Sequence, residues 1–247
     1  MQDLIHEQKF TIRGYDVGVT MQADALSIIR ILHDSAVDQV VALGFSALQL
    51  APRNLAWVLT QQYMEIFRPP TLGDQVKVIT FPSGTDRIFT YRDYQMYDLQ
   101  GTLLAQATTT WILMDLVSRK ISSFPPDIEQ ILSGANKLEH LPRAPQCRNE
   151  VQEPGYTKSY VASYFELDFN GHISNHYFFK WMLDPIPIEF LSSRELVDFN
   201  VKLKGEAFAG DEITSVISPV NNQKIEHMLY KEQKIIASGI SHWRIRM

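Results

Sequence analysis

The stretch "LLAQATTTWIL", residues 103–113, decides the fold because the chain contains its pattern twice. Near the end of the chain, "IIASGISHWRI", residues 235–245, repeats it. An alanine and a tryptophan keep the same spacing in both copies: Ala105 and Trp111, then Ala237 and Trp243. Both stretches have the composition that favours strands. A repeat of this kind predicts two copies of one structural unit.

The repeat extends outward from these two strands. The turn "EIFRPPTLGDQVKV", residues 65–78, matches "GEAFAGDEITSV", residues 205–216, because each reaches Gly-Asp before a strand. A helix predicted over residues 28–43 matches a second one over residues 173–184. In the first copy Asp24 can cap the helix and Gly44 can end it. That helix is apolar on nearly all sides, which indicates burial on most faces.

The rest of each copy reads as an antiparallel meander. In the first copy we predict a strand at 10–19 before the helix, and strands after it at 57–67, 75–81, 88–98 and 103–116, with "RPPTLGD", "PSGTD" and "DLQG" as turns. A sheet that curls round a long helix is an α+β arrangement. We therefore predict one unit at 1–135 and a second at 156–247. Prolines among polar residues predict a linker at 136–155.

Composition narrows the possible functions. The chain has 247 residues, 45% of them hydrophobic, which is enough for sizeable cores. A net charge of −5 gives no overall attraction to nucleic acid or anionic lipid. The start "MQDLIHEQKF" lacks secretory-signal features and no apolar run is long enough to span a bilayer, so we expect a cytoplasmic protein. Cys147, the one cysteine, has no nearby partner, and we expect no metal or cofactor.

Four polar residues in the second copy are candidates for chemistry. Asp168, Asn170 and His172 alternate just before the second helix, and Glu206 precedes its Gly-Asp turn. Singly, each has an ordinary explanation: capping or Asx turns for Asp168 and Asn170, a structural histidine, a solvated glutamate. The corresponding start of the first helix, "TMQADALS", has no histidine. Four such groups gathered in only one copy indicate a catalytic site.

These motifs resemble the fatty acyl-ACP thioesterases, a family with a double hotdog fold. "DFNGHISNHYFFKWMLDPIP", residues 168–187, is similar to the family's Asp-x-Asn-x-His-(Val/Ile)-x-Asn stretch and the helix after it. "YDVGV", "ALGFS" and "EIFRPPTLGDQVKV" resemble motifs of its first half. The resemblance covers nearly the whole chain. It implies catalytic roles for four residues: Asp168, Asn170, His172 and Glu206.

The resemblance also implies an activity, the hydrolysis of fatty acyl-ACP to free fatty acid and ACP, with the first unit shaping the acyl pocket. Plant members often carry cysteine after the acidic residue, but this chain has Ala207, so a Cys-His mechanism is excluded and a carboxylate must act. Plant members also begin with a plastid transit peptide. Its absence here leads us to expect a bacterial, cytosolic member.

The residue types fit this chemistry on their own account. Thioester hydrolysis needs a base or nucleophile, a group that orients it, and donors for the oxyanion. Either Glu206 or Asp168 can activate water or attack directly, and the residues alone leave that choice open. His172 can pass a proton toward the leaving thiolate, while Asn170 orients water or carbonyl. Backbone N–H groups at the helix start can receive the oxyanion.

Other functions stay open at this level. The protein can instead be an acyl-CoA thioesterase or a non-catalytic acyl-thioester-binding module. Double hotdog hydratases of enoyl thioesters also use Asp, Asn and His, but their pattern resembles Gly-Asp-x-Asn-Pro-x-x-His, whereas only Gly171 separates Asn170 from His172 here. The acyl chain length and the choice between monomer and homodimer are also open.

Overall fold

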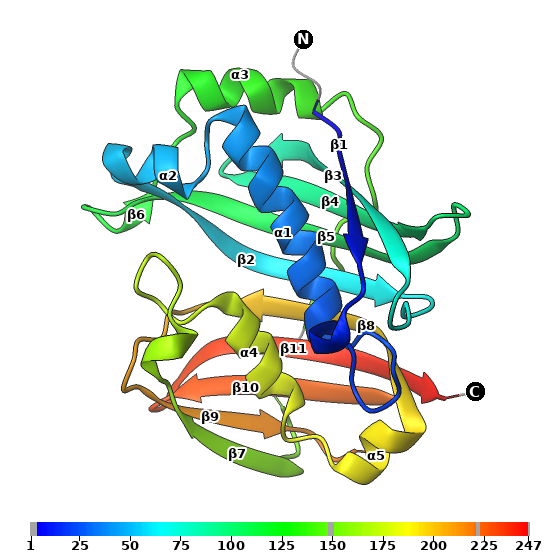
Figure 1. The fold of residues 1–247 in the computed structure, drawn as a ribbon. Coiled ribbons are helices and arrows are strands. Elements are labelled where there is room, and N and C mark those ends of the chain that lie inside the picture. Colours follow the sequence, from blue (N-terminus) through cyan, green and yellow to red (C-terminus); the bar gives the residue numbers. More distant parts are fainter. Residues whose placement is uncertain (1–3, 148–150, 221–222, 247) are drawn as a thin grey trace. The chain divides into compact units, whose positions relative to one another are not determined.

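A computed structural model of the chain describes residues 4–147, 151–220 and 223–246. The chain forms two compact units, Met1–Ala144 and Pro145–Met247. In each unit a helix lies across one face of an antiparallel sheet (Figure 1). This is the repeated α+β unit that the paired tryptophan strands predict.

The first unit contains six strands and three α-helices among its described residues. Its main sheet has the order β1-β3-β4-β5-β2, antiparallel throughout, and the short β6 pairs with β5. The strands are β1 (His6–Thr11), β2 (Leu55–Ile66), β3 (Gln75–Asp86), β4 (Phe89–Asp98), β5 (Leu103–Asp115) and β6 (Lys120–Ile121). The helices are α1 (Ala25–Leu43), α2 (Ala47–Leu50) and α3 (Pro126–Ala135), with the 3-10 turns η1 (Gly14–Asp16) and η2 (Ala51–Arg53).

The second unit repeats this topology. Its sheet has the order β7-β9-β10-β11-β8, which matches β1-β3-β4-β5-β2 strand for strand. The strands are β7 (Tyr156–Val161), β8 (Arg194–Leu203), β9 (Glu212–Ile217), β10 (Lys224–Lys231) and β11 (Lys234–Ile245). The helices are α4 (Asn175–Leu183) and α5 (Ile188–Ser193), with the 3-10 turn η3 (Tyr164–Glu166). The predicted internal repeat is confirmed.

The two matched tryptophans also make the same hydrogen bond in each unit. Trp111 Nε1 donates to Thr109 Oγ1 at 2.8 Å, and Trp243 Nε1 donates to Ser241 Oγ at 2.7 Å. A half-buried or buried indole needs a partner for its N–H. The hydroxyl two residues earlier, on the same face of the strand, supplies that partner in both copies.

Helix α1 has the predicted ends. The Asp24 side chain accepts a hydrogen bond from the N–H of Ser27, and Gly44 takes the left-handed conformation at φ 81°. The helix buries Ile28 and Leu32 against the sheet. The prediction of burial on most faces is confirmed, since Ile29, Ile31 and Ala36 are buried as well, but one stripe is not covered, because Val37 and Val41 are 53% and 44% exposed. One side of α1 therefore does not pack in the core.

The predicted strand at 10–19 is wrong over most of its length. Strand β1 ends at Thr11 and the chain then forms η1. Asp16 causes this change, because its buried carboxylate accepts the N–H of Arg13 at 2.7 Å and pairs with the side chain of Arg30. These local bonds favour a turn over the extended conformation that the aromatic and β-branched residues suggested.

"PSGTD" is another departure from the prediction. It belongs to β3 rather than to a turn, and the register with β4 shifts between Pro82 and Gly84, which marks a β-bulge. A proline in a strand is tolerated at such a bulge because the ladder is already interrupted. The bulge leaves the carbonyl of Ser83 available to a group outside the sheet.

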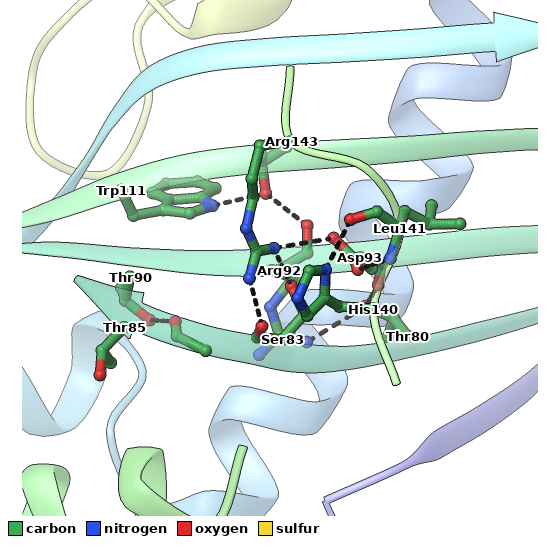
Figure 2. Close-up of polar contacts among 12 residues, drawn as sticks. Thr80, Ser83, Thr85, Thr90, Arg92, Asp93, Trp111, His140, Leu141 and Arg143 are labelled. Atoms are coloured by element: carbon green, nitrogen blue, oxygen red, sulfur yellow. Dashed lines mark hydrogen bonds and ion pairs between the residues drawn. The ribbon is translucent and has the colours of Figure 1, made fainter. Parts of the chain in front are cut away.

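The segment after α3 uses that bulge. Arg143 donates to both the hydroxyl (3.0 Å) and the carbonyl (2.6 Å) of Ser83 (Figure 2). Its guanidinium carbon also lies 4.0 Å from the ring centroid of Tyr91. Asp93, which is completely buried, accepts the N–H of Leu141 at 2.7 Å and lies 3.8 Å from Arg143. The segment predicted as a linker, 136–155, therefore divides between the units, since its first residues are bonded to the first sheet.

Candidate active site

The loop between η3 and α4 is shaped by Asp168. Its Oδ1 accepts the N–H of Asn170 at 2.8 Å and that of His172 at 3.3 Å, and its own N–H donates to the carbonyl of His172 at 2.7 Å. Gly171 has φ 76°, a left-handed conformation that suits glycine in such a turn. The contacts of Asp168 are those of an Asx turn that fixes the backbone of His172.

Helix α4 begins with a different cap. The hydroxyl of Ser174 accepts the N–H of His176 at 3.4 Å, so the capping role considered for Asp168 belongs to Ser174. Asn170 is exposed, and its side chain makes no hydrogen bond to any residue that the structure describes. Its amide is thus available to a ligand but is not held in place.

Glu206 is brought to this loop by the backbone. The N–H of Ile173 donates to the carbonyl of Ala207 at 2.8 Å, which ties the residues flanking the two candidates together. His172 Nε2 and Glu206 Oε2 then lie 3.9 Å apart, with side chains 25% and 30% exposed. Ala207 itself is completely buried, so the position where a cysteine would stand packs in the interior of the unit.

Glycine is required next to Glu206 for a steric reason. A Cβ at residue 205 would lie 2.8 Å from Cγ2 of Ile236, closer than side chains approach one another. The N–H groups of Lys204 and Gly205 both donate to the carbonyl of Ile236, at 2.8 and 3.1 Å. This close approach of two backbones sets the direction in which Glu206 leaves the strand.

The distance between His172 and Glu206 has a chemical meaning. At 3.9 Å the two groups do not share a direct hydrogen bond, and a water that bonded to both at normal lengths would lie to one side of the line that joins them. Catalytic pairs are often this long in the absence of substrate. The pair is suited to hold and activate a water molecule.

Sequence reasoning missed one residue of this site. The ring of Phe208 lies edge to face against the imidazole of His172, with centroids 5.0 Å apart and an interplanar angle of 83°. An exposed phenylalanine in a Gly-rich turn carries no sequence signal of its own. Its contact with His172 depends on the pairing of Ile173 with Ala207, which only the fold supplies.

The parts of the chain that the structure describes offer few other features that indicate a function. Within residues 4–147, 151–220 and 223–246, no group of three or more His, Cys, Asp and Glu side chains is arranged to hold a metal. Cys147 is buried, which raises the pKa of its thiol and keeps it unreactive. None of the helices in those residues is both long and apolar enough to cross a bilayer.

Two repeated units, each a curled antiparallel sheet packed on a central helix, define the double hotdog fold. Residues 3–132 match the family model for the acyl-ACP thioesterase N-terminal domain, and residues 149–245 match that for the acyl-ACP thioesterase C-terminal domain. The chain belongs to the acyl-ACP thioesterase family. The family expected from the motifs is thereby confirmed.

Individual relatives agree with this assignment. The chain is 25% identical over 259 residues to the chloroplastic acyl-[acyl-carrier-protein] hydrolase FATB2 of Cuphea viscosissima, covering 98% of this chain but only 63% of that one. A Lactobacillus plantarum structure assigned as an oleoyl thioesterase superposes with TM-score 0.88 at 25% identity, over 98% and 97% of the two chains. The 12:0-ACP thioesterase of Umbellularia californica shares the fold, with TM-score 0.87 at 19% identity, over 100% and 99%.

Proposed function

We propose that this protein hydrolyses the thioester of fatty acyl-acyl carrier protein, releasing a free fatty acid and the carrier. Membership of the acyl-ACP thioesterase family supports the substrate class. The observation that carries the proposal is the pairing of His172 with Glu206 across the Ile173–Ala207 hydrogen bond. A carboxylate and an imidazole this close together can serve as the base and the proton carrier that thioester hydrolysis needs, which supports the proposal.

In the proposed reaction Glu206 accepts a proton from the bridging water as that water attacks the thioester carbonyl. The tetrahedral intermediate then collapses, the C–S bond breaks, and the proton that Glu206 took from water passes by way of His172 to the departing thiolate. The carboxylate of Asp168 is already occupied with two backbone N–H groups of its turn, which favours Glu206 as the base and Asp168 as support. Asn170 orients the water or the carbonyl.

The oxyanion needs donors that are not already used. At the start of α4 the N–H groups of Ile173, Ser174 and His176 all donate within the protein. The N–H of Asn175 has no partner among the residues that the structure describes. We assign it to the oxyanion, since it lies at the positive end of the helix dipole. The assignment of the acyl tail to the first unit stays a prediction.

The test is release of free thiol from acyl-ACP and acyl-CoA of several chain lengths. Glu206→Gln and His172→Ala should each lower kcat by roughly 10²–10⁴, the usual range for general acid-base groups. The double variant should lose little beyond the less active single variant, because the two groups act as one unit. His242→Ala is the matched control, since His242 also pairs with a carboxylate, Asp198 at 2.8 Å, in the same unit.

The outcomes separate the candidate functions. Thiol release from acyl-CoA alone would make the protein an acyl-CoA thioesterase. If an enoyl thioester is supplied and its absorbance is lost without release of thiol, the protein is a hydratase. If an acyl thioester binds but is not turned over, the protein is a sensor. Full activity of both Glu206→Gln and His172→Ala would refute the site. Asp168→Asn should lower kcat more than the melting temperature explains, since its turn positions His172.

A further inference from the structure

The orientation of the His172 imidazole is unexplained by hydrogen bonds. Neither ring nitrogen makes a hydrogen bond to any residue within the described ranges, and the Glu206 carboxylate lies 3.9 Å away. A histidine ring without such a partner is free to rotate about its side-chain bonds unless packing prevents it. One group that packs against this ring is Phe208, edge to face with centroids 5.0 Å apart.

Phe208 is contacted in turn by two charged residues, Asp211 and Lys231. The Oδ2 atom of Asp211 accepts the backbone N–H of Phe208 at 2.7 Å and forms an ion pair with Lys231 Nζ at 2.6 Å. The Lys231 ammonium lies 5.2 Å from the centroid of the Phe208 ring, within the range of a cation-π contact. One carboxylate therefore fixes both the backbone of Phe208 and the cation that attracts its ring.

Burial does not explain this arrangement, because Phe208 is 42% exposed and gains little from packing in a core. The turn does not require a phenylalanine at this position either. In the first unit the equivalent turn has Thr71, whose N–H donates to Asp74 at 2.8 Å in the same way. The aspartate is thus a feature of the turn in both units. The aromatic ring with its lysine occurs in the unit that carries the histidine.

We propose that Phe208 is a positioning residue, braced by Asp211 and Lys231, which holds the imidazole of His172 toward Glu206. The inference rests on the proposed function of that pair. It assigns to the turn at 208–211 the role that a hydrogen-bonded carboxylate has in many catalytic histidines. Removing the ring should therefore harm the chemical step more than the binding of substrate.

The experiment compares four single variants and the double variant that combines Phe208→Leu with Lys231→Met. Phe208→Leu removes the ring but keeps apolar volume, and Phe208→Tyr keeps the ring. Lys231→Met removes the cation but keeps the stem. Lys224→Met is the control, since Lys224 lies on the same strand, β10, and pairs with Glu226 at 2.8 Å. Each variant is measured for melting temperature, for kcat and KM with acyl-ACP, and for the imidazole C–H signals of His172 in the NMR spectrum, assigned by their loss in His172→Ala.

Phe208→Leu should lower kcat roughly 10-fold with little change in KM, as expected when a catalytic group loses its orientation. Its His172 signals should move, because the ring current of Phe208 is gone, while Phe208→Tyr should restore both properties. Lys231→Met should lower kcat about 2- to 5-fold, a factor typical of one exposed cation-π contact. The lysine change should have no further effect in the Phe208→Leu background. Lys224→Met should match the wild type.

Wild-type kcat in Phe208→Leu, or unmoved His172 signals, would overturn the proposal. A fall in kcat that only parallels a lower melting temperature would overturn it as well. The NMR measurement needs no turnover. In Lys231→Met both rings remain, so displaced His172 signals there report a changed geometry between the rings and test the positioning role even if the protein fails to hydrolyse acyl-ACP. A protein that is inactive but shows the displaced signals would sink the proposed function and leave the role of Phe208 standing.

Discussion

The second unit contains a buried histidine that should make its stability depend on pH. His227 is 1% exposed, with Nδ1 2.8 Å from the carbonyl of Met182 and Nε2 2.7 Å from the hydroxyl of Ser241. A carbonyl only accepts, so Nδ1 carries the proton and Nε2 accepts from Ser241 in the neutral ring. Ser241 in turn accepts from Trp243. The neutral ring thus joins the end of α4 to strands β10 and β11.

Protonation is disfavoured at this position. Burial lowers the pKa of His227 from 6.5 to about 4, although the carbonyl of Met182 acts in the opposite direction. Between these values the unfolded chain binds a proton that the folded protein does not, so the free energy of unfolding falls as the pH falls. The total loss is about 3 kcal/mol, since one pKa unit corresponds to about 1.4 kcal/mol. About 2 kcal/mol of this is lost between pH 7 and pH 5.

The comparison is between the wild type and His227→Gln, whose amide can still donate to Met182 and accept from Ser241 but does not titrate. Urea unfolding at pH 7, 6 and 5 gives the free energy of each protein. The wild type should lose about 2 kcal/mol more than the variant over this range. Equal losses in wild type and His227→Gln would refute the reasoning.

Three further substitutions test the frame around the candidate site. Gly205→Ala forces a Cβ against Ile236, so it should lower the free energy of unfolding by about 1–3 kcal/mol and lower kcat. Adding Ile236→Ala should partly restore both, and full activity of Gly205→Ala alone would contradict the steric argument. Asp93→Ala leaves the N–H of Leu141 without its acceptor, so it should cost about 1–3 kcal/mol and speed proteolysis within 136–144; an unchanged cleavage rate would contradict it. Asp24→Ala removes the cap of α1 and should cost about 0.5–2 kcal/mol in urea unfolding, whereas the exposed Asp34→Ala should cost less.

The fold was predictable where local pattern and repeat agreed. Strands β2, β4 and β5 lie within two residues of their predicted ends, and α1 has its predicted caps. Predictions failed where a single polar group decides the backbone. The carboxylate of Asp16 turns the chain after β1, and a bulge keeps "PSGTD" within β3. Periodicity records the spacing of apolar residues, so it reveals neither a bond from one side chain to a nearby backbone N–H nor an interrupted register between two strands.

The four polar residues of the candidate site were predictable from the sequence, but their contacts were not. Spacing alone gathered Asp168, Asn170 and His172, and the repeat located Glu206 near a matching turn. The structure places His172 beside Glu206 and gives Asp168 a role in the turn. Sequence had no means of finding Phe208, because its importance arises from a ring contact between two loops. Whether the four residues catalyse stays a prediction for the variants above.

The two units show why side chains must distinguish the proposed catalytic unit from the other one. The same backbone bonds frame both helix starts. The N–H of Ala23 donates to Pro70 at 2.8 Å, as that of Ile173 does to Ala207 at 2.8 Å. The N–H of Gly18 donates to the carbonyl of Gln22 at 3.1 Å, as that of Asp168 does to His172.

These shared bonds are a requirement of the fold, since they join the helix start to the turn before a strand in each copy. They therefore cannot be what distinguishes a catalytic unit from a structural one. The difference lies in the side chains displayed on the shared frame. The first unit has Gly18, Thr20, Gln22 and Pro69 where the second has Asp168, Asn170, His172 and Glu206. The fold does not dictate the side chains at these positions. Because they hold proton-transfer groups in only one copy, they are the positions expected to determine function.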